Sequence, residues 1–290
     1  MMNATTMAMA IAIAIHTTNA FCPAPSRNRG TGYNYALFSS SGSSDVAGLV
    51  ENLPSVEDLK SAPFMKQVGY GADMTDALTA LEKSNVDSQE ASLSKTLQTS
   101  LSAQLSHSDG IRGFMVSYLT GSYEDSTDED GGIDAAEMIA TEQDPKILLE
   151  TLSGLLSNNS NDDDDDGNSN SNDDLVSLMC MNVIMPIAMI TMHQDPALSA
   201  ASRLTAARGI RLLGSVVNPS ISENLSAIQK AAATNDDNNN DDDDDDDDDS
   251  KSEPLVDYWT NFFAKWGYEE TQKKDIAAAT EEMLSKSSSQ

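Results

Sequence analysis

Apolar residues recur at intervals of three and four along much of the chain, as they do on one side of an amphipathic helix. Between residues 88 and 105, leucines occupy every fourth position, at Leu93, Leu97, Leu101 and Leu105. A second apolar segment with helical spacing begins at Ser108 and ends at Gly121. No convincing run of alternating β-branched residues predicts a strand. The pattern therefore predicts an all-α protein, an irregular helical bundle of five to seven helices.

Capping residues mark the starts of several helices. Asp144-Pro145 and Asp195-Pro196 each place a side-chain acceptor before a proline, as at an N-cap followed by the first helical residue. They predict helices that run to about residue 156 and to about residue 217. Ser108 is predicted to cap the helix that follows it.

Residues 175–192 contain no charged side chain, so this segment meets the lower length limit of a membrane-spanning helix. Asn182 and Pro186 interrupt it, and its flanks lack the Lys, Arg, Trp or Tyr residues that anchor a span. We therefore expect a helix buried on all sides at the centre of the bundle. The alternative is a membrane span.

Aromatic residues concentrate near the C-terminal end, where six of them lie between Tyr258 and Tyr268. In a helix that starts at Pro254, four share one face at the spacing i, i+3, i+4 and i+7: Trp259, Phe262, Phe263 and Trp266. Such a stripe has to be covered, either by the same bundle or by a groove on another protein or a membrane interface. These four residues are the candidate partner-binding residues.

Charge divides the chain into ordered and disordered parts. With 47 acidic and 17 basic residues, the formal net charge is −30. Residues 158–172 and 234–252 are rich in Asp and Asn and contain nothing to bury, so they are predicted to be disordered inserts. They leave a helical domain at 45–233 and an aromatic helical segment at 253–286. Because the chain lacks a basic face, nucleic acid is excluded as a partner.

One acidic segment carries oxygen donors at the spacing of a cation-binding loop. From Ser126 to Glu137 it resembles the calcium loop of EF-hand proteins, with Gly131 at the sharp turn. The candidate metal ligands are Ser126, Asp128, Asp130, Gly132, Asp134 and Glu137. Ser126 stands where that family has Asp, and no persuasive second loop pairs with this one. The resemblance therefore implies weak Ca²⁺ binding, and the alternative is a solvated acidic loop without a metal.

The remaining candidates for chemistry are few. His107 and His193 lie at predicted helix ends, where a structural role explains them. The sequence contains no nucleophile elbow, no phosphate-binding glycine loop and no zinc-ligand spacing. Cys180 is predicted to be a buried small hydrophobe. Arginines 112, 203, 208 and 211 are predicted to form surface ion pairs. The sequence thus favours a protein that is not an enzyme, although it does not exclude catalysis, and it indicates no cofactor other than the Ca²⁺ of the acidic loop.

The N-terminal region has the composition of a targeting segment. Residues 1–20 contain an apolar run followed by small residues, as in a signal peptide, and residues 21–44 contain arginine but no acidic residue, as in a transit peptide. The junction Asn19-Ala20-Phe21-Cys22-Pro23 resembles the bipartite presequence of diatoms and related algae with complex plastids. This resemblance implies import into the plastid, with the stroma as the favoured location and Phe21 as the import mark. Plain secretion is the alternative.

The segment from Ser108 to Thr120 and the apolar helix around Asn182 are similar to uncharacterised helical proteins of cyanobacteria and plastids. That similarity implies no activity. The sequence as a whole predicts a plastid-targeted, non-catalytic helical protein, an interaction or assembly factor that binds another plastid protein. The alternatives are a weak calcium-binding module, a thylakoid-associated membrane protein that uses residues 175–192, and an unrecognised enzyme.

Overall fold

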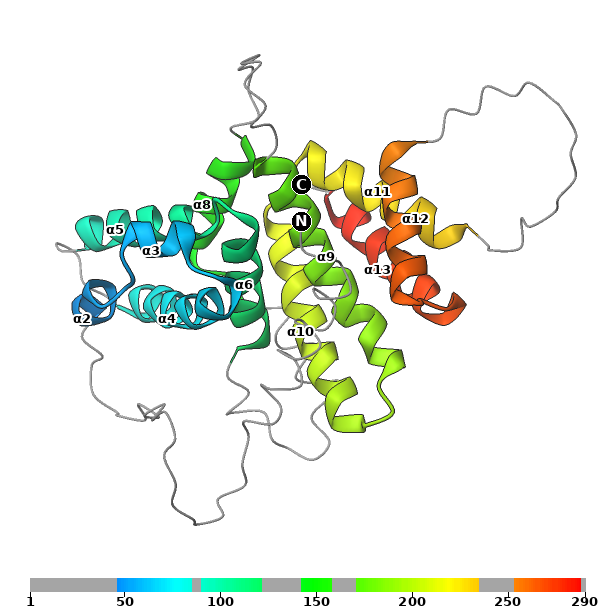
Figure 1. Ribbon diagram of the computed structural model, residues 1–290, viewed down its shortest axis with the longest axis horizontal. Helices are drawn as coiled ribbons and strands as arrows, with labels where there is room; N and C mark the ends of the chain where they lie inside the picture. The colour runs from blue at the N-terminus through cyan, green and yellow to red at the C-terminus, as the bar shows by residue number, and fades with distance from the viewer. Residues whose placement is uncertain (1–45, 85–89, 122–141, 158–170, 235–252, 288–290) are drawn as a thin grey trace, which may run out of the picture. The chain divides into compact units, whose positions relative to one another are not determined.

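The computed structural model describes residues 46–84, 90–121, 142–157, 171–234 and 253–287, and every regular element within these ranges is a helix. In chain order the helices are α2 (Val46–Glu51), α3 (Val56–Ser61), α4 (Phe64–Lys83), α5 (Glu90–Gln104), α6 (Ser108–Thr120), α8 (Lys146–Ser157), α9 (Ser171–Met192), α10 (Pro196–Ser215), α11 (Pro219–Ala233), α12 (Pro254–Trp266) and α13 (Glu270–Ser287) (Figure 1). The all-α prediction is therefore confirmed for the described residues.

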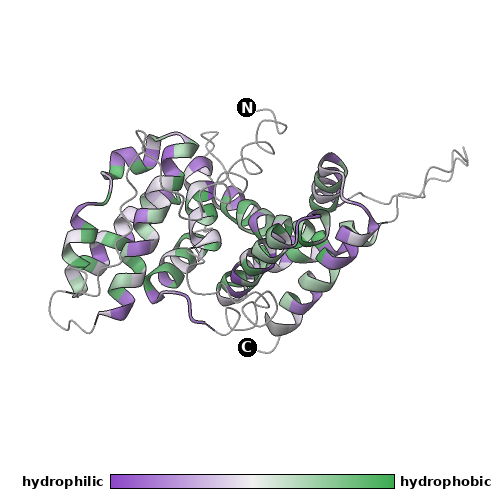
Figure 2. Ribbon diagram, turned by 90° about the horizontal axis from the view of Figure 1, so that it is seen from below, coloured by the Kyte–Doolittle hydropathy of each residue, from purple (hydrophilic) through white to green (hydrophobic). Residues whose placement is uncertain are grey.

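The predicted number of five to seven helices is wrong, because the described residues alone contain eleven. The additional helices include α4, α11 and α13. In α4 and α13, small and polar residues weaken the apolar periodicity. Helix α11 has a clear apolar face, and Asn218 caps its start by accepting a 2.8 Å hydrogen bond from the Ile221 amide. Figure 2 shows hydrophobic and hydrophilic positions alternating along the helices, as amphipathic segments require.

Helix α9 forms the centre of the packing, with contacts to α6, α8, α10, α11 and α13. Every residue from Leu178 to Ala188 is buried. Among the described helices, α9 alone has the length and apolar composition to cross a membrane, and 72% of its most apolar window is buried inside the protein. The structure therefore has this segment as a core helix surrounded by other helices.

Polar groups inside α9 are accommodated locally. The Asn182 side-chain amide donates a 2.7 Å hydrogen bond to the Leu178 carbonyl, one turn earlier. This bond satisfies a polar group that would otherwise be buried without a partner. Cys180 is buried, as predicted, and burial raises the pKa of its thiol to about 12. The thiol therefore stays protonated and packs as an apolar group.

Helices α4 and α6 cross with their backbones in contact, because each carries a glycine at the crossing. A Cβ atom on Gly71 would lie 2.8 Å from the Gly113 carbonyl oxygen, and one on Gly113 would lie 2.5 Å from the Gln67 carbonyl carbon. Both distances are shorter than van der Waals contact. The absence of two side chains therefore sets how closely these helices approach.

This crossing gives a prediction with a matched control on the same helix. We expect Gly71→Ala to lower the free energy of unfolding by about 1–3 kcal/mol, because its methyl group meets backbone atoms that cannot move alone. Gly69→Ala, two residues earlier, meets nothing within 4 Å, so it should raise stability by about 0.5–1 kcal/mol through helix propensity. Urea denaturation gives the free energy of unfolding of both variants. If both variants changed this free energy by the same amount and in the same direction, α4 and α6 would not be in backbone contact at Gly71.

The start of α6 differs from the sequence prediction. His107, not Ser108, is the N-cap: its Nδ1 accepts a hydrogen bond of 3.3 Å from the Gly110 amide. The other ring nitrogen lies 2.8 Å from the Leu59 carbonyl oxygen and 3.2 Å from the Gln67 side-chain nitrogen. These contacts come from residues 40 and 48 positions away, and they hold the His107 ring at the N-cap. The residues next to His107 in the sequence therefore do not reveal this cap.

The C-terminal helices α12 and α13 belong to the same compact unit as the rest of residues 46–290. Both pack on α11, and α13 also contacts α9. Lys230, near the end of α11, forms a 2.6 Å ion pair with Glu253 at the start of α12. At the other end of α12, Gly267 has a φ of 66°, a left-handed conformation that favours glycine and turns the chain into α13.

The two predicted inserts fall largely outside the described residues. Ser171 and Asn172, however, belong to α9, so the first insert was predicted two residues too long at its end. At the second insert, Thr234 is the C-cap of α11 and its amide donates to the Ala231 carbonyl. The predicted targeting segment at residues 1–44 also lies outside the described residues.

Candidate functional site

The four predicted partner-binding residues lie together on α12, where they meet Tyr268. Trp259 and Phe263 are fully buried, Phe262 is 8% exposed, and Trp266 is half-buried. Trp259 meets Phe262 edge to face, with ring centroids 5.5 Å apart. The ring centroids of Tyr268 and Phe263 lie 5.8 Å apart. The stripe is thus covered by the same bundle, the first of the two alternatives that the sequence left open. Partner binding by these residues stays a prediction.

One margin of the aromatic stripe on α12 keeps an exposed ring and a half-buried ring, and we call it the aromatic edge. We define it as Tyr258, Phe262 and Trp266, which follow one another at i, i+4 and i+8. The Tyr258 side chain is 43% exposed, and the Phe262 and Trp266 rings lie 5.8 Å apart. Sequence reasoning missed Tyr258 because it lies one position outside the apolar stripe. Its exposure depends on how α12 is rotated against the bundle.

One buried polar network joins Tyr118, Asp144 and Arg211. Asp144 Oδ1 accepts hydrogen bonds from the Tyr118 hydroxyl at 2.5 Å and from Arg211 Nη2 at 2.7 Å. The Asp144 side chain is 0% exposed, and the Arg211 side chain is 10% exposed. Arg211 Nη1 also donates to Glu142 at 3.0 Å. The prediction that Arg211 forms a surface ion pair is therefore wrong: its main pair is buried.

Burial shapes the protonation of this network. It raises the pKa of the Tyr118 hydroxyl far above its ordinary value, and the Asp144 carboxylate adds to the effect. The pKa of Arg211 is also raised, because its hydrogen bonds and attraction to Asp144 outweigh the opposing effect of burial. The Tyr118 hydroxyl therefore keeps its proton throughout the physiological range of pH and donates it in the hydrogen bond to Asp144.

The predicted N-cap role of Asp144 is also wrong. Its carboxylate points to Tyr118 and Arg211, whereas the amide of Lys146 in the first turn of α8 donates to Glu82 Oε2 at 3.4 Å. The capping acceptor thus comes from α4, 64 residues away in the sequence. Arg208, another predicted surface residue, is half-buried and donates a 3.2 Å hydrogen bond to the Leu119 carbonyl near the C-terminus of α6.

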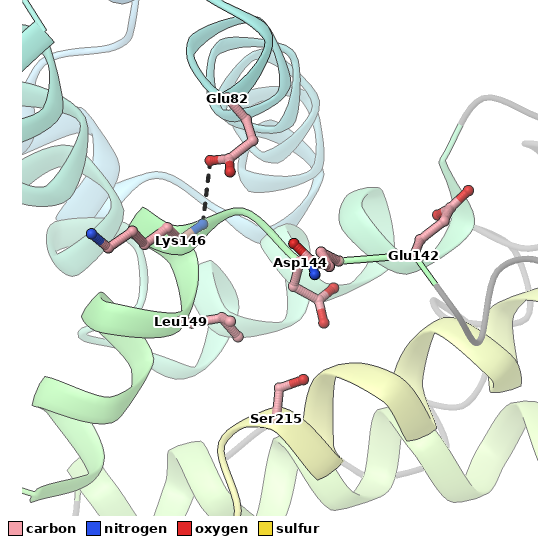
Figure 3. A pocket seen from close by; sticks show the side chains of 7 residues that line it. Glu82, Glu142, Asp144, Lys146, Leu149 and Ser215 are labelled. Carbon is pink, nitrogen blue, oxygen red and sulfur yellow. Dashed lines mark hydrogen bonds between the residues drawn. The ribbon is translucent and has the colours of Figure 1, made fainter.

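A cavity of about 380 Å³ lies beside this network, where the end of α4, the start of α8 and the end of α10 meet. Figure 3 shows Asp144 inside a ring of side chains, with Glu82 on one side and Ser215 opposite. The lining residues are Glu82, Glu142, Gln143, Asp144, Lys146, Leu149 and Ser215.

Hydrogen-bond acceptors outnumber donors in this cavity. Asp144 Oδ2 is buried, and no donor among the described residues reaches it. The ammonium group of Lys146 is directed to solvent, because its side chain is 80% exposed and lies 3.6 Å from Glu150. The Ser215 hydroxyl already donates to the Arg211 carbonyl. The accessible part of the lining therefore consists of the Glu82 and Glu142 carboxylates and the Gln143 amide, whereas the Asp144 side chain is 0% exposed.

The predicted calcium ligands Ser126, Asp128, Asp130, Gly132, Asp134 and Glu137 lie outside the described residues. Within the part of the chain that is described, no group of three or more His, Cys, Asp or Glu side chains is placed to hold a metal ion. His193 directly follows the last residue of α9, and its amide donates to the Met189 carbonyl. His107 caps the start of α6 and His193 follows the end of α9, so the two histidines lie at the ends of different helices.

No protein-family model, no curated protein and no solved structure matches the chain. Two places among the described residues are therefore the candidate sites on geometry alone. They are the aromatic edge of α12 and the cavity beside Asp144.

Proposed function

We propose that the chain is a plastid-targeted, non-catalytic helical protein, an interaction or assembly factor that contacts another plastid protein through the aromatic edge of α12. The observation that carries this proposal is the Tyr258 ring, 43% exposed, on the same helix as the half-buried Trp266. Tyr and Trp supply a disproportionate share of binding energy at protein interfaces, because they present a large area at a small entropic cost.

The surroundings of the aromatic edge support the same role. Asp257, Asn261 and Lys265 on α12 are exposed, so polar residues of both charges flank the rings. A central aromatic contact with a polar rim is the ordinary anatomy of a protein interface. The buried residues beneath, Trp259 and Phe263, hold the helix so that the edge is rigid before a partner arrives.

The protonation of the buried groups supports a non-catalytic role. Burial raises the pKa of Cys180 to about 12 and moves the pKa values of Tyr118 and Tyr268 further above neutrality. A general acid, general base or thiolate nucleophile needs a pKa close to the working pH. These groups stay protonated at neutral pH, where they pack and donate hydrogen bonds.

Site-specific photocrosslinking in intact plastids tests the interaction. A benzophenone amino acid at Tyr258 should form a covalent adduct of defined mass with one plastid protein, since the edge lies at the interface. The same amino acid at Glu57, an exposed residue of α3, is the control and should not form that adduct. An identical set of adducts from both positions would overturn the proposed edge.

A fluorescent fusion tests the location separately. The full chain with a C-terminal fluorophore should coincide with chlorophyll fluorescence in an alga with complex plastids. Phe21→Ala should stop the fusion before it enters the plastid, whereas Phe38→Ala, outside the junction, should not. Secretion of the wild-type fusion would contradict plastid targeting. It would not affect the proposed contact through α12, which the crosslinking experiment tests.

A further inference from the structure

Charged side chains follow the aromatic edge along α12 in a definite order. Asp257, Asn261 and Lys265 recur at i, i+4 and i+8, one position before each ring of the edge, and all three are exposed. A carboxylate therefore lies at the Tyr258 end of the edge and an ammonium group at the Trp266 end. The two ends of the edge present opposite charges to a partner.

Other helices make the Tyr258 end more acidic. Partial burial raises the pKa of Tyr258, Asp174 in the first turn of α9 adds to this effect, and Arg112 on α6 opposes it. Both charges thus act on the Tyr258 hydroxyl. The Arg112 side chain is 19% exposed and its Nη1 lies 3.8 Å from Asp109 Oδ1, whereas Asp174 is exposed. Among the described residues, the accessible charge beside Tyr258 is therefore negative.

We infer, on the basis of the proposed contact through the aromatic edge, that the partner places a positively charged side chain, arginine or lysine, at the Tyr258 end of this edge. A cation above a tyrosine ring is attracted by the negative face of the ring. A carboxylate within reach adds an ion pair. Tyr258 supplies the ring from α12 and Asp174 supplies the carboxylate from α9, so two helices contribute to the same contact.

The charge of the whole chain favours a basic protein segment over the other occupants of such an edge. The formal net charge is −30, which accelerates the approach of a positively charged partner. The same charge repels a second copy of the chain and the headgroups of anionic lipids. Of these three occupants, the basic segment is the one that is attracted both at long range and at the Tyr258 ring.

Titration of the full chain with a fluorescent amphipathic peptide of leucine and arginine, followed by anisotropy, tests the inference. We expect saturable binding that Tyr258→Leu weakens about threefold, because leucine is apolar but has no ring face. Tyr258→Phe keeps the ring and should keep the affinity. Neither variant changes the net charge, so attraction of the peptide to the aspartate-rich segments is the same in all three proteins.

A second pair of variants tests the carboxylate. Asp174→Asn should weaken peptide binding about threefold. Glu223→Gln removes the same charge from an exposed position of α11 and should leave the affinity unchanged. Equal affinities for wild type, Tyr258→Leu and Asp174→Asn would overturn the inference, as would the absence of saturable binding to wild type. Self-association of the chain that Tyr258→Leu abolishes would also overturn it, since a second copy would then occupy the edge.

The peptide titration and the photocrosslinking experiment fail independently. A specific adduct from position 258 combined with equal peptide affinities would leave the proposed interaction standing and remove the basic character of the partner. Identical adducts from positions 258 and 57 would contradict the proposed interaction itself, whatever the affinity for the peptide.

Discussion

We expect replacement of Asp144 by alanine to lower the free energy of unfolding by about 3–5 kcal/mol, one of the two largest effects that we expect in the described residues. The variant leaves the Arg211 guanidinium, 10% exposed, without its main carboxylate partner. It also removes the acceptor of the buried Tyr118 hydroxyl. Removing one partner of a buried pair costs more than the pair itself contributes, since the remaining charge stays desolvated.

Glu142→Ala is the control for this experiment. Glu142 also pairs with Arg211, at 3.0 Å, but its side chain is 59% exposed and is screened by water. Its loss should therefore cost less than about 1 kcal/mol. Urea denaturation of both variants, followed by circular dichroism, gives the two free energies. Equal losses would show that Asp144 is solvated in solution and that the buried network does not exist as described.

The second large effect is expected at Trp259, whose side chain is 0% exposed. Trp259→Ala should lower the free energy of unfolding by about 3–5 kcal/mol, because it opens a cavity among Phe262, α11 and neighbouring side chains. The loss should appear as a lower midpoint in urea, measured by circular dichroism because the variant also removes a fluorescent indole.

Tyr258→Ala, one position earlier on the same helix, is the matched control. Its side chain is 43% exposed, so the variant should change stability by less than about 1 kcal/mol while it removes the exposed ring of the aromatic edge. Comparing Trp259→Ala with Tyr258→Ala therefore separates the effect of losing core packing from the effect of losing the exposed ring. If Trp259→Ala cost no more than Tyr258→Ala, α12 would not be docked on the bundle, and the aromatic stripe would itself be the free binding surface.

Much of the helical architecture followed from local patterns. The leucines at every fourth position predicted α5, and Asp195-Pro196 correctly predicted the start of α10, where the Asp195 carboxylate accepts from the Ala197 amide at 2.8 Å. The glycine at position 121 ended α6 as expected, with a φ of 40°. These features depend on residues within one or two turns of each other, and such interactions can be deduced from the sequence alone.

The errors concern long-range contacts. Asp144 has the sequence signature of an N-cap, but Arg211, 67 residues away, takes its carboxylate, and Glu82 from α4 takes over the cap. The cavity could not be predicted for the same reason, since its walls come from three helices. Tyr258 was missed because exposure depends on the rotation of α12, which its buried neighbour Trp259 sets. Local propensity does not contain this information.

The central physical claim is that α9 is the core of a bundle that folds in water. Hydrogen exchange of the full chain in detergent-free buffer, resolved by peptide mass spectrometry, tests it most directly. Amides between Leu178 and Ala188 should be the slowest to exchange in the chain, since every residue there is buried and opens only with global unfolding. Exchange of this segment as fast as that of the exposed ends of the helices, with protection gained only in detergent or lipid, would contradict the claim.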